Sequence, residues 1–150
     1  MADTNLTIYL AHGDARHRKV IAANLELLHH HVVLSTASPA VLVRRCQERP
    51  PDIAIVGTRF DEEDCFDVLN RLSNEDVCTV IAILRHDDVG RSRRLLGNRI
   101  MGVLVEPVNH GDLRTAIYLA RKRFAQSKEM QARIGQLKDE LSEIERDERL

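Results

Sequence analysis

A series of short hydrophobic runs, each five or six residues long, marks the first two thirds of the chain. The runs are rich in Val and Ile and are too short for typical helices, which favours β-strands. They occupy residues 6–11, 31–35, 52–56, 79–84 and 101–105. We therefore predict five strands at these positions.

The segments between these runs show the three-to-four-residue spacing of helices. Ile21, Leu25 and Leu28 mark one helical face after the first run. After the second run, Ser38 and Pro39 form a typical helix start, because serine caps the first turn and proline fits the first helical position. Alternating strands and helices, with continuously apolar strands, predict a parallel sheet covered on both faces. We expect an α/β fold with a doubly wound, five-stranded, flavodoxin-like sheet in the order 2-1-3-4-5.

The C-terminal part of the chain has the pattern of one long helix that starts at Gly111, with Asp112 as a good N-cap residue. Up to Phe124 its apolar positions fit packing on the sheet. Beyond Phe124 they follow alternating steps of four and three residues, which is typical of a coiled coil. These positions are Met130, Ile134, Leu137, Leu141 and Ile144. We expect a globular domain over residues 1–124 and, over residues 125–150, a helical extension that dimerises through these five positions.

Composition narrows the functional classes. The 150 residues are 43% hydrophobic and 30% charged, which is ordinary for a soluble globular protein. The net charge of −1 gives no general attraction to nucleic acid or to an anionic membrane. No segment approaches the roughly 18 apolar residues of a membrane span, and the N-terminus lacks the pattern of a secretory signal. Three cysteines without a C-x-x-C motif fit a reducing compartment, so we expect a cytoplasmic protein.

In a doubly wound sheet, functional residues lie beyond the carboxyl ends of the strands. This rule points to residues 12–14 after the first strand, 57–59 after the third, 85–86 after the fourth and 106–107 after the fifth. We therefore expect a functional crevice at these strand ends.

Two stretches of the sequence resemble bacterial response-regulator receiver domains. "PDIAIVG" is similar to the third strand of that family, and "VLVEPVNHGDLRTAI" to its fifth strand and the helix that follows. The resemblance extends over about residues 6 to 124. In that family an acidic pair after the first strand holds Mg²⁺, and an aspartate at the end of the third strand accepts a phosphoryl group. A Thr or Ser ends the fourth strand, and a Lys precedes the proline after the fifth.

Every one of these functional positions differs in this sequence. His12 and Gly13 stand in place of the acidic pair, Gly57 in place of the acceptor, Leu84 in place of the hydroxyl residue and Glu106 in place of the lysine. Phosphoryl transfer to a protein needs a nucleophile and a cation that neutralises the developing charge. The resemblance therefore implies a degenerate phospho-acceptor pocket, formed by His12, Gly13, Asp14, Gly57, Leu84 and Glu106. The chain would then be a pseudo-receiver, a two-component-type signalling module that works without phosphorylation. We expect no enzymatic activity, no cofactor and no bound metal.

Two alternatives remain for the acidic residues near the pocket. A shift of one residue in the first strand would leave Asp14 as an acidic ligand, although it would not restore the acceptor. Four acidic residues after the third strand, Asp61, Glu62, Glu63 and Asp64, are candidates for phosphorylation at an atypical carboxylate. In that case the protein would be a conventional response regulator with an unusual acceptor.

The histidines suggest one further possibility. His29, His30 and His31 are consecutive, so their side chains do not converge on one point, and a helix end is the better interpretation. His12 and His86 both follow strands and have aspartates nearby, namely Asp14, Asp87 and Asp88. A small ligand or a transition metal between them is the alternative to solvent-exposed loop residues.

A basic cluster follows the fourth strand. Arg91, Arg93 and Arg94 lie close together, with Arg85 and Arg99 on either side. The cluster is either a solvated helix face or a binding surface for an acidic partner or RNA.

A receiver-like domain with a helical extension resembles the ANTAR-type antiterminator regulators, in which a coiled coil leads into a small RNA-binding module. Here the chain ends at Leu150, where that module would begin. We expect RNA as a partner only if the chain is a fragment of a longer regulator. Otherwise the expected partner is a second copy of the chain, or a helix of another protein, held by the C-terminal helix.

Overall fold

Five parallel strands form one sheet in the order β2-β1-β3-β4-β5, as the hydrophobic pattern predicts. The computed structural model describes residues 5–57, 60, 65–75, 78–87 and 100–148. The strands are β1 (Thr7–Ala11), β2 (His31–Thr36), β3 (Ile53–Gly57), β4 (Thr79–Leu84) and β5 (Gly102–Val105). Each strand differs from its predicted run by at most one residue at either end.

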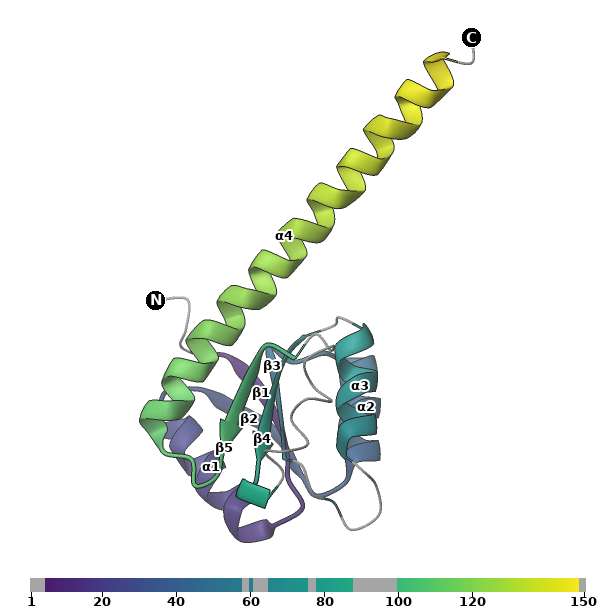
Figure 1. Cartoon of the computed structure of the whole chain (residues 1–150). Coiled ribbons are helices and arrows are strands. Elements are labelled where there is room, and N and C mark those ends of the chain that lie inside the picture. Colours follow the sequence, from purple (N-terminus) through teal and green to yellow (C-terminus); the bar gives the residue numbers. More distant parts are fainter. Residues whose placement is uncertain (1–4, 58–59, 61–64, 76–77, 88–99, 149–150) are drawn as a thin grey trace.

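Four helices are described, and they cover both faces of the sheet. They are α1 (Ala15–Leu27), α2 (Pro39–Glu48), α3 (Cys65–Glu75) and α4 (His110–Glu148). Helices α2 and α3 lie side by side on one face, and α1 and α4 lie on the other (Figure 1). Ser38 caps α2 as predicted, because its hydroxyl accepts a hydrogen bond from the Val41 N–H.

Two apolar clusters, one on each face of the sheet, form the core. Side chains from β1 alternate between them, so Tyr9 belongs to the cluster under α2 and α3, and Leu10 to the cluster under α1 and α4. Strands β3 and β4 are buried along their whole length, as their continuous apolar sequences predict. Strand β2 differs, because it is an edge strand whose side chains alternate in exposure, and Val33 is 53% exposed.

Two cysteines are part of this core. Cys46 and Cys78 are not joined in a disulfide, and both are buried in the cluster under α2 and α3. A hydrogen bond between the Cys78 and Cys46 side chains, together with burial, raises the pKa of the Cys78 thiol well above its usual range. Both residues therefore act as small apolar side chains in the packed interior.

Helix α4 begins slightly earlier than the sequence predicts, and its N-cap is a different residue. The Asn109 side-chain oxygen accepts a hydrogen bond of 2.8 Å from the Asp112 N–H, so Asn109 is the cap. The prediction of Asp112 as N-cap is therefore wrong. Asp112 lies in the first turn, where its negative charge suits the positive end of the helix dipole.

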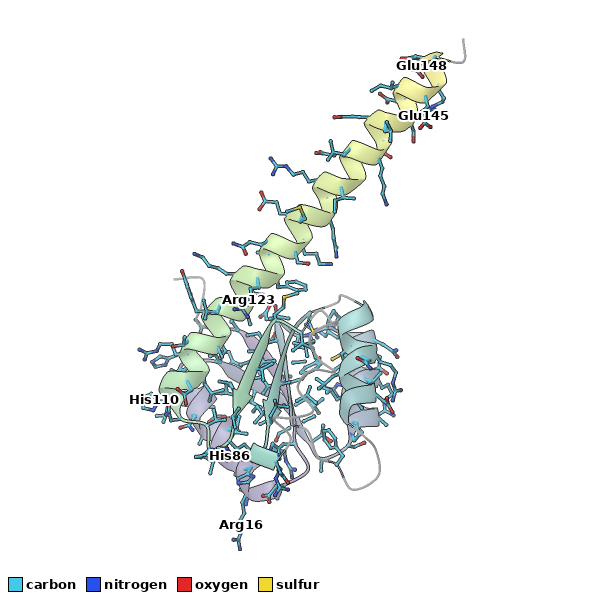
Figure 2. All side chains as sticks on the ribbon, in the orientation of Figure 1. Arg16, His86, His110, Arg123, Glu145 and Glu148 are labelled. Atoms are coloured by element: carbon cyan, nitrogen blue, oxygen red, sulfur yellow. The ribbon has the colours of Figure 1, made fainter. Side chains whose placement is uncertain are left out.

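The second half of α4 leaves the domain as an isolated rod (Figure 1). Leu113, Ile117 and Ala120 are buried against the sheet, as predicted. The rod projects from the end of the sheet opposite to the one where Arg16 and His86 lie (Figure 2).

Among the described residues, no helix has the length and apolar character needed to cross a membrane.

Several predicted functional residues lie outside the described residues. They are the acidic residues Asp61, Glu62, Glu63 and Asp64, the aspartate Asp88, and the basic residues Arg91, Arg93, Arg94 and Arg99.

Candidate functional site

The candidate site is at the carboxyl end of the sheet. His12 directly follows β1, Gly57 ends β3, and Glu106 directly follows β5. Backbone hydrogen bonds continue the sheet beyond the strands at two of these points, from the His12 N–H to the Thr36 oxygen and from the Glu106 N–H to the Leu84 oxygen. In the sheet order, β3 and β4 separate β1 from β5, so a contact between His12 and Glu106 must pass over the ends of these two strands.

Gly57 makes this crossing possible. A Cβ atom added at position 57 would lie 2.7 Å from His12 Cδ2, which is too short for carbon atoms in contact, and 3.0 Å from His12 Cγ, which is tighter than most such contacts. Gly57 does not have a left-handed φ, so its backbone does not require glycine. The constraint is space. The imidazole ring of His12 fills the volume that a side chain at position 57 would need.

The His12 ring is held by hydrogen bonds at both nitrogens. Nδ1 accepts a hydrogen bond of 3.0 Å from the Asp14 N–H, and Nε2 lies 2.5 Å from Glu106 Oε1. An imidazole nitrogen that accepts from a backbone N–H carries no proton, so this pattern assigns the proton to Nε2. Nε2–H therefore donates to the Glu106 carboxylate. The two side chains are only 8% and 13% exposed.

His17 completes a cluster of three side chains. It lies in the first turn of α1, with Nδ1 3.5 Å from Glu106 Oε2 and its ring edge-on to His12 at a centroid distance of 5.4 Å. Its side chain is 54% exposed, so it forms the outer side of the cluster. The sequence prediction did not include His17. The signal that places it is the Asp14 cap, which fixes the start of α1 and therefore which residues lie in its first turn.

Asp14 has a structural role in this arrangement. Its carboxylate accepts hydrogen bonds from the backbone N–H groups of Arg16 and His17 and so caps α1. These bonds lower the pKa of the Asp14 carboxyl below its usual value, and the bond from the His17 N–H has the largest effect. Arg18 also stabilises the turn between β1 and α1, because its guanidinium donates a hydrogen bond of 2.7 Å to the His12 carbonyl.

The structure does not bring all of the predicted residues together. Leu84 is 1% exposed and belongs to the apolar cluster under α2 and α3. Gly13 lies in the short turn between His12 and the Asp14 cap. His86 and Asp87 are exposed, and Asp87 is 3.7 Å from Arg85. Among the described residues, the ligand atoms that converge belong to His12, His17 and Glu106, without His86.

The three consecutive histidines have separate positions, and the prediction of a helix end is confirmed. Helix α1 ends at Leu27, and His29 has a φ of 66°, in the left-handed region common after helix ends. His30 is buried and accepts a hydrogen bond from the Leu6 N–H. His31 is the first residue of β2.

Comparison with known proteins finds similarity only among solved structures. No family model matches the sequence, and no curated protein matches it at a significant level. A response regulator receiver domain protein from Clostridium thermocellum superimposes with a TM-score of 0.68 at 21% identity, covering 78% of this chain and 94% of the other. The signal receiver domain of a modulated diguanylate cyclase from Desulfovibrio desulfuricans gives 0.73 at 21% identity, with coverage of 81% and 98%.

A third solved structure leads to the same fold. The REC domain of AraT, a response regulator from Geobacillus stearothermophilus, gives a TM-score of 0.70 at 15% identity and covers 83% of this chain and 99% of its own. Matches at such low identity establish the fold and nothing finer. The chain therefore has the flavodoxin-like fold of response-regulator receiver domains, extended by the long helix α4.

Proposed function

We propose that this chain is a two-component-type signalling module, a pseudo-receiver that works without phosphorylation and without enzymatic activity. The observation that carries the proposal is the position of the His12 ring against Gly57. If the pocket corresponds to that of receivers, an imidazole fills the volume where the acceptor carboxylate would stand.

The rest of the pocket supports the same conclusion. Phosphoryl transfer requires a nucleophile, and the developing negative charge must be neutralised by a cation and by hydrogen-bond donors. At the position of the receiver lysine, Glu106 adds a negative charge, and its carboxylate is already bonded to His12. Leu84, at the position of the hydroxyl residue, lies in the apolar core. The described groups of the pocket therefore repel a phosphoryl group more than they attract it.

The output that we propose is association through the C-terminal helix. The predicted coiled-coil positions are all exposed although all are apolar, with exposed fractions between 46% and 61%: Met130, Ile134, Leu137, Leu141 and Ile144. Most of the stability of protein helices comes from packing of an apolar face, and an apolar stripe of this kind is typical of a surface that binds another helix. We take the partner to be a second copy of the chain.

Charges beside the stripe favour an antiparallel pair. With Ile134 at position a, the g positions are Arg133 and Glu140, and the e positions are Lys138 and Glu145. A parallel dimer would place Arg133 against Lys138 and Glu140 against Glu145, and both contacts are repulsive. An antiparallel dimer would place Arg133 against Glu140 and Lys138 against Glu145. Both of these contacts are attractive, so the helices would cross with the two domains at opposite ends.

Analytical ultracentrifugation of four samples tests the proposal. The intact chain and a version ending at Gln126 are each measured with and without acetyl phosphate and Mg²⁺. We expect a dimer for the intact chain and a monomer for the shortened one, with no effect of the phosphoryl donor on either. Equal association of the two versions would rule out the helix as the interface, and a donor-dependent change would contradict phosphorylation independence.

A full-length pair of variants removes the effect of truncation. Leu137→Asp places a charge in the stripe, whereas Gln136→Asp places the same charge on the neighbouring exposed position. The proposal predicts that the first variant is monomeric and that the second remains a dimer.

A further inference from the structure

We propose that His12, His17 and Glu106 form a binding site for a divalent transition-metal ion of the Zn²⁺ type. One nitrogen of each histidine and a carboxylate oxygen of Glu106 lie within 4.8 Å of one another. The sequence prediction was no bound metal, with a transition metal between His12 and His86 as the alternative, and it did not include His17. The proposal is independent of the association of α4 and of the absence of phosphorylation.

The geometry has to adjust to accept an ion, because His12 and His17 contact different oxygens of the Glu106 carboxylate. Zinc binds histidine nitrogen and carboxylate oxygen at about 2.0–2.2 Å, so neighbouring ligand atoms in a tetrahedral site lie about 3.3 Å apart. The distance from His17 Nδ1 to Glu106 Oε2 is already 3.5 Å. The hydrogen-bonded pair of His12 Nε2 and Glu106 Oε1 is closer, at 2.5 Å. An ion that replaces the hydrogen bond would move these two atoms apart by roughly 1 Å.

The chemistry of the ligands selects the class of metal. Two imidazole nitrogens and one carboxylate suit zinc and its neighbours in the first transition row, whereas Mg²⁺ prefers oxygen ligands. Three protein ligands leave a fourth position for water or for a small ligand. The site therefore differs in both residues and metal preference from a carboxylate site for Mg²⁺.

The cluster also has an inner and an outer part. His12 and Glu106 are nearly buried and follow strands, so their positions are fixed by the sheet. His17 is 54% exposed and gives the ion access from solvent. Charged groups on the same turn include the Asp14 carboxylate, which caps α1, and the Arg18 guanidinium, which is bonded to the His12 carbonyl. Of the three proposed ligands, Glu106 is the one that supplies a negative charge to the ion.

Metal binding must change the tautomer of His12. Without metal, the proton is on Nε2 and the Asp14 N–H donates to Nδ1. A neutral imidazole that coordinates through Nε2 carries its proton on Nδ1, so the proton moves from one nitrogen to the other and none is lost from the ring. Nδ1–H then opposes the Asp14 N–H. The turn at Gly13 and Asp14, which begins α1, has to rearrange when the ion binds.

Co²⁺ titration of the full chain tests the site, because its visible absorption reports coordination by nitrogen and oxygen ligands. We expect one Co²⁺ per chain, displaced by Zn²⁺. His17→Ala removes an exposed ligand at a helical position and should weaken binding by about tenfold or more. His31→Ala and His110→Ala replace exposed histidines outside the cluster and should leave the affinity unchanged. Far-UV circular dichroism checks that each variant is folded.

A second variant and a spectroscopic readout distinguish a metal site from a structural contact. Glu106→Gln keeps an oxygen acceptor for His12 but removes the negative charge, and it should also weaken Co²⁺ binding. Nitrogen-15 NMR of the imidazoles should show His12 protonated at Nε2 without metal and at Nδ1 with Zn²⁺. The proposal is overturned if no Co²⁺ or Zn²⁺ binds, if His17→Ala binds as tightly as the unmodified chain, or if only replacement of the histidines at positions 29–31 removes binding.

Discussion

The ring of His12 lies where a side chain on Gly57 would have to be, with only 2.7 Å between His12 Cδ2 and a Cβ atom added to the glycine. The two residues follow or end neighbouring strands, since β1 pairs directly with β3. A pocket that contains this histidine in this position can tolerate only glycine at position 57. Histidine at position 12 and glycine at position 57, far apart in the sequence, are therefore one structural feature.

This relationship predicts the effect of adding one methyl group. Gly57→Ala should lower the free energy of unfolding by about 1–3 kcal/mol, because the new Cβ displaces the buried ring of His12. Urea denaturation measures the change. Gly135→Ala is the matched control, since no atom lies within 4 Å of a Cβ at that helical position, and it should stabilise the chain by about 0.4–1 kcal/mol. A loss of stability at position 135 and none at position 57 would contradict the packing described.

A double mutant extends the same test to the pair. His12→Ala removes the ring that collides with the new methyl group, so Gly57→Ala should destabilise this background much less than the unmodified chain. The interaction energy of the cycle is expected to be about 0.5–3 kcal/mol. Strict additivity would show that the two residues do not compete for the same volume.

The hydrogen bond between His12 and Glu106 gives the second prediction. Glu106→Ala leaves the nearly buried Nε2–H without an acceptor, which should destabilise the chain by about 1–3 kcal/mol. Glu106→Gln retains an acceptor oxygen and should lose less. Thermal or urea unfolding of the two variants measures the difference. If the glutamine variant were as unstable as the alanine variant, the hydrogen bond would not be the stabilising interaction.

The helix cap predicts part of the pH dependence of stability. Backbone hydrogen bonds from His17 and Arg16 lower the pKa of Asp14 in the folded state. A lowered carboxyl pKa stabilises the fold at pH values above the unfolded pKa of about 3.9, and this stabilisation is lost as the pH falls through the folded pKa. An asparagine side chain also caps helices but does not titrate, so the substitution Asp14→Asn isolates the effect of the charge.

The measurement is urea unfolding of both proteins over the acid range. We expect the unmodified chain to be the more stable of the two near pH 6 and the difference to shrink as the pH approaches 3. A difference that stayed constant over this range would show that the Asp14 charge makes no contribution.

A charge reversal on α4 distinguishes the two helix arrangements by the sign of its effect. Arg133→Glu places two negative charges together in the antiparallel dimer but creates an attractive pair with Lys138 in the parallel one. Exposed pairs contribute about 0.2–1 kcal/mol each, and each dimer contains two copies. Sedimentation equilibrium at low salt should show weaker dimerisation for Arg133→Glu and recovery when Glu140→Arg is added. Tighter dimerisation of the single variant would establish the parallel arrangement instead.

Most of the fold could be predicted from the sequence because burial controls the pattern. Strands β3 and β4 are buried on both faces, and their continuous apolar runs locate them within one residue. The prediction of where α4 starts was less accurate, because Asn109 and Asp112 are both suitable cap residues and only the backbone geometry selects between them. The exposed alternation of β2 follows from its place at the sheet edge, which depends on strand order more than on its own sequence.

The candidate site could be predicted only in part. The rule that functional residues follow parallel strands located His12, Gly57 and Glu106. The spacing of residues along the sequence could not show that the His12 ring crosses the end of β3. That position depends on the orientation of the side chain, which is fixed by hydrogen bonds with the Asp14 N–H and the Glu106 carboxylate. His17 was missed because its proximity to Glu106 is a tertiary contact between the first turn of α1 and the end of β5, which are far apart in the sequence.

Intact-mass spectrometry of the purified chain after incubation with acetyl phosphate and Mg²⁺ tests the central claim most directly. With the His12 ring against Gly57, and Glu106 at the end of β5, the account predicts no covalent phosphoryl adduct. A receiver domain with an intact acceptor, treated in parallel, shows that the donor is active. A phosphoryl adduct on this chain, especially one lost when Asp61 or Asp64 is replaced by Asn, would contradict the claim and identify a conventional regulator with an unusual acceptor.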